Sequence, residues 1–421
     1  QTGWQTVDGL KYYFDRDGVM QKGFIILGNS VYYTGDDGVM VKGWQNIGGY
    51  RYYFDSSSGV MITGIKFISG NYYGFDIKGH MLEGWQYISG HTYYFNEEGK
   101  AIIGWYQEDD IIYYFLETGI RVESTWKVID EKTYYFDSDG IMVKGFLALG
   151  NDKYYLGDEG IRQIGWQHIG GYVYYFDIST AKMVIGLKEI DGKLYYFNSE
   201  GHMLTGWQDI DGKKYYFDEN GVMVTGFRTI GAYTYYFDKG VMVKESRRAI
   251  DGFTYYFDEY GHMAIGFTVI SGKTYYFDAK GHMLFGFQVI GKEKYYFDAE
   301  GIMAIGWTTI DSRKYYFNKQ GVMAVGITVI GDFKYYFDEN GVMGIGFVKV
   351  EGRTYYFDVE GHMLFGWQTI DGKRYYFGVD GVMAVGITVI GDFKYYFDEN
   401  GVMGIGFVKV EGRTYYFDVE G

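Results

Sequence analysis

The pair Tyr-Tyr, usually followed by Phe-Asp, recurs 21 times from Tyr12-Tyr13 to Tyr415-Tyr416, and successive pairs are always 20 or 21 residues apart. A unit of this length has too little apolar surface to form a core by itself, so it must stack on its neighbours. The period therefore restricts the chain to a repeat array in which each unit packs against the next.

One complete unit, residues 206–226, contains two short strand-like segments around a turn. Residues 207–210 predict a strand, Asp211-Gly212 is a favoured hairpin turn, and 213–217 predict an aromatic return strand. The next turn combines an aspartate, which can accept backbone N–H bonds, with a glycine that tolerates positive φ. The sequence therefore predicts an all-β solenoid of stacked hairpins of about 20 residues each, without helices.

The longest internal duplication spans three units, because residues 321–361 recur without change as residues 381–421. About three hairpins per superhelical turn would return equivalent faces to the same side with this period. Duplication of whole units would leave the same trace, so both explanations stay open. We expect a single array of about 21 hairpins over residues 1–421, and the first residues, which begin within a repeat, indicate a fragment of a longer protein.

Charge and apolar patterning exclude two classes of partner. The formal net charge is −15 and the pI is about 5.0, whereas nucleic acids and anionic membranes require a basic face. No apolar stretch approaches the roughly 20 residues of a membrane span. We therefore expect neither nucleic-acid binding nor membrane insertion.

Catalytic and metal-binding constellations are also not expected. The chain has no Cys, and five of its seven His lie in Gly-His-Met turns, far apart in sequence, at His80, His202, His262, His282 and His362. These His are expected to fill turns rather than to converge on a metal. Carboxylates recur in nearly every turn, whereas an active site needs one tuned constellation. We predict no cofactor, no metal and no enzyme activity in this array, although a catalytic domain could lie outside it.

The repeated pattern Gly-Trp-Gln-x-Ile-x-Gly-Lys-Lys-Tyr-Tyr-Phe-Asp-x-x-Gly-x-Met-x-x-Gly closely resembles the cell-wall-binding repeats of Gram-positive surface proteins. These include choline-binding modules, the glucan-binding repeats of glucansucrases and the C-terminal repetitive oligopeptides of large clostridial toxins. The resemblance covers the whole chain. It implies a β-solenoid whose aromatic grooves bind choline or carbohydrate, in a protein that is secreted or displayed on the bacterial cell surface.

The residue before Tyr-Tyr discriminates among these relatives. In choline-binding modules it is typically Trp, which helps to complete an aromatic cage around a quaternary ammonium group. A cation in that wall would repel choline, so the chain is expected to be more similar to the toxin and glucan-binding repeats. A choline-type wall anchor of an autolysin is the further alternative. In this chain the residue before Tyr-Tyr is, for example, Lys11, Val31, Thr133, Lys214, Thr274, Lys334 or Arg374. We predict that no aromatic residue occupies this position in any unit.

We expect the ligand sites at the junctions between units. Each would combine the second Tyr of one pair, the Met after its turn and the aromatic residue that opens the next unit, while the first Tyr supports the solenoid. A flat indole suits the apolar face of a sugar ring, and nearby Lys, Gln and Asp can bind its hydroxyls. The Trp-bearing candidates are Tyr33, Met40 and Trp44; Tyr73, Met81 and Trp85; Tyr196, Met203 and Trp207; Tyr296, Met303 and Trp307; and Tyr356, Met363 and Trp367.

These features predict a non-catalytic module that attaches to carbohydrate, with toxin-like binding to host glycan favoured and bacterial wall polysaccharide as the other target. Several weak sites would bind a repetitive polymer multivalently. The alternative is a structural solenoid or surface filament whose aromatic junctions only stack the repeats. Two irregular units, at 119–126 and 244–248, lack the usual Gly-aromatic step and predict a changed twist or a unique binding surface.

Overall fold

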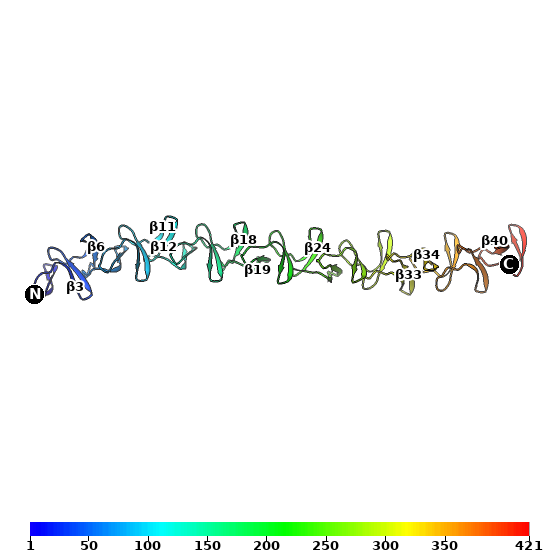
Figure 1. The fold of residues 1–421 in the computed structure, drawn as a ribbon, viewed down its shortest axis with the longest axis horizontal. Helices are drawn as coiled ribbons and strands as arrows, with labels where there is room; N and C mark the ends of the chain where they lie inside the picture. The colour runs from blue at the N-terminus through cyan, green and yellow to red at the C-terminus, as the bar shows by residue number, and fades with distance from the viewer. Residues whose placement is uncertain (421) are drawn as a thin grey trace. The chain divides into compact units, whose positions relative to one another are not determined.

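The computed structural model describes residues 1–420 and contains only β-strands and turns (Figure 1). Within these residues the strands form 21 antiparallel sheets, of which 20 are single hairpins and one, β23-β24-β25, has three strands. The predicted all-β array of stacked hairpins is confirmed. The turn of about three hairpins remains a prediction.

All strands except two have five residues. The first twenty are β1 (Gly3–Val7), β2 (Leu10–Phe14), β3 (Gly23–Leu27), β4 (Ser30–Thr34), β5 (Gly43–Ile47), β6 (Tyr50–Phe54), β7 (Gly64–Ile68), β8 (Asn71–Phe75), β9 (Gly84–Ile88), β10 (His91–Phe95), β11 (Gly104–Glu108), β12 (Ile111–Phe115), β13 (Thr125–Ile129), β14 (Lys132–Phe136), β15 (Gly145–Leu149), β16 (Asp152–Leu156), β17 (Gly165–Ile169), β18 (Tyr172–Phe176), β19 (Gly186–Ile190) and β20 (Lys193–Phe197). The others are β21 (Gly206–Ile210), β22 (Lys213–Phe217), β23 (Gly226–Ile230), β24 (Tyr233–Asp238), β25 (Val241–Met242), β26 (Ser246–Ile250), β27 (Phe253–Phe257), β28 (Gly266–Ile270), β29 (Lys273–Phe277), β30 (Gly286–Ile290), β31 (Glu293–Phe297), β32 (Gly306–Ile310), β33 (Arg313–Phe317), β34 (Gly326–Ile330), β35 (Phe333–Phe337), β36 (Gly346–Val350), β37 (Arg353–Phe357), β38 (Gly366–Ile370), β39 (Lys373–Phe377), β40 (Gly386–Ile390), β41 (Phe393–Phe397), β42 (Gly406–Val410) and β43 (Arg413–Phe417).

The array divides into two compact units. The first comprises Gln1–Gln208 and Phe217–Met223, and the second comprises Asp209–Tyr216 and Val224–Gly421. Both units consist of the same kind of hairpin, so the geometry of one hairpin describes the building block of each.

The hairpin β32-β33 illustrates the common register. Trp307, which opens the unit, lies directly across from Tyr316, the second Tyr of the pair, and Thr308 lies across from Tyr315. The two turn residues, Asp311 and Ser312, both have positive φ, as the hairpin turns that match strand twist require. The register therefore places the opening aromatic residue and the second Tyr side by side on one face.

The core of each hairpin is formed by the first Tyr and the Phe, which point to the same face of the strand. Phe317 is completely buried and Tyr315 is 5% exposed. Met323 continues the sheet by bridging to Phe317, and its N–H donates to Lys294 O of the preceding hairpin at 2.8 Å. Each Met thus joins the hydrogen bonding of its own hairpin to that of the previous one.

The turn after the return strand is capped by its aspartate. Asp338 Oδ1 accepts hydrogen bonds from the N–H groups of Asn340 and Val342, at 2.9 and 2.8 Å. The same arrangement recurs in Asp15, whose Oδ1 accepts from Asp17 and Val19. The predicted carboxylate-capped turns are confirmed, and one oxygen of each cap, Oδ1, is already engaged by backbone donors.

The glycine of this turn packs directly against the neighbouring hairpin. Gly321 has φ +80°, and a Cβ at this position would lie 2.5 Å from Met303 Sδ. Glycine is therefore required here for two reasons, the left-handed backbone and the close approach of the Met below it.

Both irregular units keep the hairpin register. Thr125 and Ser246 take the place of the opening glycine, which elsewhere has positive φ, and pair with Phe136 and Phe257 as that glycine would. The positive φ moves one residue earlier, to Ser124 and Glu245. These departures thus shift a backbone conformation by one position without interrupting the array.

Candidate binding grooves

One recurrent hollow takes its walls from three consecutive hairpins. In the Trp307 groove, of 280 Å³, Trp307 and Lys314 come from one hairpin, Tyr335 and Met343 from the next, and Glu360 from the turn of the third. Equivalent positions line two further hollows, of 350 and 360 Å³, with Trp105, Ile112, Tyr134, Met142 and Glu159, and with Phe287, Lys294, Tyr315, Met323 and Asn340. Repetition of one geometry in both units makes these grooves the candidate sites.

The indole of the Trp307 groove is held between two tyrosines and leaves area exposed. The Trp307 ring centroid lies 4.9 Å from that of Tyr335 and 5.3 Å from that of Tyr316, in edge-to-face arrangements. Trp307 remains 44% exposed although Tyr335 is 8% exposed. The indole therefore forms a rigid apolar platform that a ligand ring could cover.

The structure groups the predicted residues differently from the sequence prediction. Tyr73 and Met81 pack with Trp44, which opens the preceding hairpin, and the Trp44 and Tyr73 ring centroids are 4.8 Å apart. Trp85, their predicted companion, packs instead against Tyr113 of the following hairpin, at 4.8 Å. A groove therefore joins the opening aromatic residue of one hairpin with the first Tyr and the Met of the next.

The other predicted trios are divided in the same way. Their second Tyr packs on the buried Phe of the next hairpin, their Met lies beneath the next turn, and their Trp contacts the first Tyr of the next pair. These contacts are Tyr33 with Phe54, Met40 with Gly59, Tyr196 with Phe217, Met203 with Gly221, Tyr296 with Phe317, Met303 with Gly321, Trp307 with Tyr335, Tyr356 with Phe377, Met363 with Gly381 and Trp367 with Tyr395. Trp207 is the second residue of β21, the same strand position as the other opening Trp residues.

The two members of the Tyr-Tyr pair also exchange the roles predicted for them in these grooves. Tyr134, Tyr315 and Tyr335, which line the three hollows, are all first members. The second member faces its own opening aromatic residue in the register, so it supports that ring from the side. Strand alternation predicts that the two tyrosines separate, but only the stacking of hairpins decides which one reaches the groove.

Positive charges stand beside the indoles, as the residue before Tyr-Tyr predicts. Arg51 Cζ lies 4.3 Å from the Trp44 ring centroid, and Arg374 Cζ lies 4.7 Å from that of Trp367. Lys294 Nζ spans its groove and donates to Glu339 O at 2.8 Å. Arg51 and Arg374 already make the cation–π contact that a quaternary ammonium group would make with these indoles.

One hairpin corrects the prediction that no aromatic residue precedes the first Tyr. In β7-β8, Tyr73 pairs with Lys66 and therefore holds the place of a first Tyr, while Gly74 holds that of the second. Tyr72 then occupies the preceding place. The strand length between turn and Phe75 is constant, so Gly74 displaces the visible Tyr-Tyr pair by one position.

At two junctions an arginine that the sequence analysis did not single out replaces the regular Met and lies near the indole. Arg121 Cζ lies 5.6 Å from the Trp85 ring centroid, and its Nη2 donates to Glu123 at 2.8 Å. Arg162 lies in the same way over Trp126, at 5.5 Å. A guanidinium of the chain itself therefore lies near the opening indole at these two junctions.

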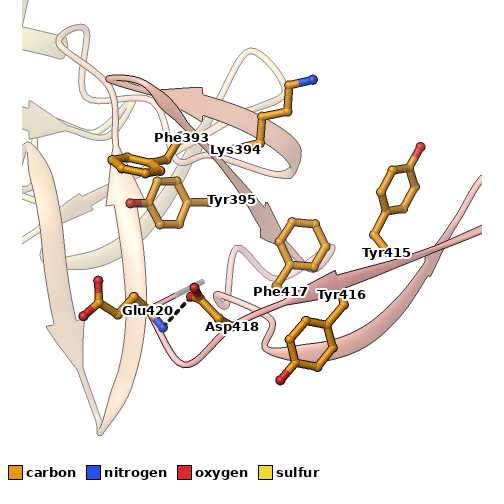
Figure 2. A pocket seen from close by; sticks show the side chains of 8 residues that line it. All are labelled: Phe393, Lys394, Tyr395, Tyr415, Tyr416, Phe417, Asp418 and Glu420. Carbon is orange, nitrogen blue, oxygen red and sulfur yellow. Dashed lines mark hydrogen bonds between the residues drawn. The ribbon is translucent and has the colours of Figure 1, made fainter.

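The final two described hairpins form a further hollow of 360 Å³ (Figure 2). Phe393 and Tyr395 lie close together on one side, and Lys394 points away from them. Tyr416 and Asp418 belong to the second hairpin, and Asp418 Oδ1 accepts the Glu420 N–H at 2.9 Å. This hollow has aromatic and charged walls without an opening indole.

Ionisation of the groove tyrosines is suppressed by their surroundings. Burial, together with the Asp358 carboxylate, raises the pKa of Tyr335, and burial with Asp398 raises the pKa of Tyr375. Their hydroxyl groups are therefore neutral near pH 7 and able to donate as well as accept hydrogen bonds. Across residues 1–420, no three His, Cys, Asp or Glu side chains gather in a metal-binding arrangement, and no helix is long and apolar enough to cross a membrane.

Comparison with known proteins identifies the family. The choline-binding repeat family matches the chain almost throughout, at residues 1–42, 41–83, 82–126, 122–162, 163–203, 184–224, 204–246, 246–285, 284–325, 304–345, 324–365, 344–385 and 364–405. The chain therefore belongs to the choline-binding repeat family, a class of non-catalytic modules of cell-surface and secreted proteins that bind cell-wall components and carbohydrate.

Several solved structures are similar. Choline-binding protein F from Streptococcus pneumoniae is 29% identical over 62% of this chain and 98% of its own, with a TM-score of 0.34. The modular autolysin LytC from the same organism is 22% identical over 52% of both chains, with a TM-score of 0.36. Alternansucrase, in complex with isomaltononaose, is 20% identical over 95% of this chain and 23% of its own, with a TM-score of 0.19. No curated protein matches the chain.

Proposed function

We propose that this array binds carbohydrate at a cell surface through its inter-hairpin grooves. The observation that carries the proposal is the Trp307 groove, in which an indole that is 44% exposed lies beside Lys314 and Glu360. The indole can cover the apolar face of a pyranose while the two charged side chains bind its hydroxyls. The equivalent Trp105 groove repeats the platform in the other unit.

Repetition of the grooves along the array supports multivalent attachment. The Arg side chains beside the indoles favour a sugar over choline as the ligand. Single shallow hollows of 280–360 Å³ suggest weak individual sites, which a polymer can engage several at a time. Arg51 and Arg374 stand where a ligand ammonium would bind. We therefore favour receptor binding to host glycan, in the manner of toxin repeats, with bacterial wall polysaccharide as the other target and a choline-type anchor as the less favoured ligand chemistry.

A glycan array tests the proposal when it includes host glycans, wall polysaccharides and immobilised choline. We expect dense glycan spots to retain the chain, and Trp105→Ala with Trp307→Ala to weaken retention. The matched control is Val379→Ala, which truncates a turn side chain that is 96% exposed and lines none of the three grooves. Retention on choline alone would replace carbohydrate by choline as the ligand, and no retention of a folded chain on any spot would contradict the proposal.

The second candidate is a structural array without a ligand. It is favoured by the burial of the first Tyr and the Phe in hairpin after hairpin, which shows that much aromatic surface serves stacking. Under this alternative the two Trp variants would reduce stability, but neither they nor the wild type would be retained on the array.

A further inference from the structure

A second structural motif also links consecutive hairpins. The His of each Gly-His-Met turn stacks face to face on the aromatic residue that begins the return strand of the preceding hairpin. We call each pair a His clasp. The five clasps, with ring centroids 3.8–3.9 Å apart, are Tyr50–His80, Tyr172–His202, Tyr233–His262, Phe253–His282 and Phe333–His362.

Four of the clasps have large side chains after the His. A Leu follows the Met, and a Gln occupies the third position of the next strand, where its Nε2 donates to a main-chain oxygen at 2.6–2.9 Å. These pairs are Leu82 and Gln86, Leu204 and Gln208, Leu284 and Gln288, and Leu364 and Gln368. The space beside these clasps is thus taken by bulky residues in a repeated way.

The His262 clasp has small residues at the same places. Ala264 replaces the Leu and Thr268 replaces the Gln. With Ala279 from the next turn they border a hollow of 410 Å³, which lies in the range of about 300–1,000 Å³ typical of small-molecule sites. Ala264 and Thr268 therefore take up less of the space beside this clasp than the Leu and Gln do beside the other four.

The hollow combines an aromatic wall with polar groups. Tyr233 and Tyr256 contribute rings, while Asp258, His262 and Thr268 contribute polar atoms. The wall ring is itself unusual, because the register places Arg247 rather than an aromatic residue across from Tyr256. Arg247 belongs to the irregular unit at 244–248, which lacks the Gly-aromatic step. The hollow therefore lies at a hairpin whose sequence differs from the repeat pattern.

Arg247 is directed towards the following hairpins. Its Cζ lies 4.2 Å from the Tyr275 ring centroid, and its Nη1 donates to Glu300 O at 3.3 Å. The guanidinium is thus engaged elsewhere and is not among the residues that line the hollow.

We propose that the hollow beside the His262 clasp is a separate binding site for a neutral pyranose. The Tyr256 ring would cover the apolar face of the sugar, and the Thr268 hydroxyl and the Asp258–His262 pair would bind its hydroxyl groups. The site differs in its lining residues from the Trp grooves and stands independently of the function proposed for them.

The charge distribution selects a neutral ligand. Asp258 is the acidic residue of the lining, and no Lys or Arg lines the hollow, so a carboxylated or phosphorylated sugar would be repelled. The Asp258 charge is already stabilised by nearby donors, which weakens its attraction for a cation but leaves Oδ2 able to accept a sugar hydroxyl. Oδ1 accepts from the N–H groups of Tyr260 and His262, and Oδ2 lies 3.1 Å from His262 Nδ1.

The test uses the imidazole signals of the full chain in NMR, since only seven His are present. Methyl glucoside and methyl N-acetylglucosaminide are titrated separately, and His262→Val assigns the signal. We expect one or both of these sugars to shift the His262 signal. A shift of the His362 signal would instead report sugar in the Trp307 groove, because His362 contacts Tyr335.

The decisive variant combines Ala264→Leu with Thr268→Gln, the residues found at the other clasps. We expect it to weaken sugar binding at His262 by more than tenfold, with unchanged signals from the other His as evidence of folding. Trp307→Ala is the matched control and should leave the His262 response unchanged, whatever it does to glycan retention. The proposal is overturned if neither sugar shifts His262, if the filled variant responds like the wild type, or if choline chloride shifts His262 more than the sugars do.

Discussion

Truncation of one buried phenyl ring should reveal how far a hairpin depends on its neighbours. Phe277, in β29, is completely buried, bridges to Met283 and packs in a cluster with Tyr275 and Tyr256. Phe→Ala changes in packed cores cost about 3–5 kcal/mol. Because a hairpin is marginal alone, we expect Phe277→Ala to loosen β28-β29 and its two junctions rather than the whole array.

Hydrogen exchange measures this loosening amide by amide. The two junctions are reported by Met283 N–H, which donates to Thr254 O, and by Met303 N–H, which donates to Thr274 O. A loss of 3–5 kcal/mol corresponds to a decrease in protection of about 2.2 to 3.7 powers of ten. Val289→Ala, which truncates an exposed side chain in the adjacent hairpin, should change protection by less than about threefold.

Two results of hydrogen exchange on Phe277→Ala would contradict the expectation that loosening stays local. Decreased protection that spreads equally to distant hairpins such as β34-β35 would show that the unit unfolds as one body. Protection reduced by less than tenfold at both junctions would show that the Phe ring contributes little to stacking. Either result would refute the nearest-neighbour account of stability.

Three further predictions concern a turn, a cap and a groove. Gly321→Ala should lower the free energy of unfolding, measured in urea, by about 1–3 kcal/mol, because it strains a left-handed backbone. Met303→Ala should restore part of the lost stability by removing the clash with the new Cβ. If it restores none, the contact with Met303 is not the cause of the loss. The Ser179 hydroxyl and other donors lower the pKa of Asp177, so this carboxylate should stabilise the fold above its unfolded pKa of about 4 and lose that effect as pH falls below it; acid titration monitored by circular dichroism should show a flatter profile for Asp177→Asn. Arg374→Thr should remove the cation over the indole that opens its hairpin and raise choline affinity by about 2- to 30-fold, measured by tryptophan fluorescence, and an unchanged affinity would contradict the repulsion argument.

Much of a single hairpin could be predicted from its residues. Asp211-Gly212 marks the turn, and the alternation within the return strand separates Tyr215 and Phe217 from Tyr216. These are local properties, set by backbone preference and by a period of two residues. The irregular unit around Ser246 could also be recognised in the sequence. The positive φ that its backbone adopts at Glu245 could not be predicted.

The grooves could be predicted only in part. Trp307, Met303 and Tyr296 were expected to meet, but the Trp307 groove contains Tyr335 and Met343 instead. Periodicity cannot distinguish these groupings, since residues one unit apart carry the same letters. The choice depends on the angle between neighbouring hairpins, which is a property of their packing.

Local sequence therefore determined the hairpin, its repeat and its membership of an array, because turns and strand alternation act over a few residues. The tertiary structure alone decided which ring meets which. It placed the first Tyr in the Trp grooves, brought Arg121 and Arg162 near two opening indoles, and left a hollow beside His262. Each of these outcomes joins residues from different hairpins, and such contacts follow from how the units stack.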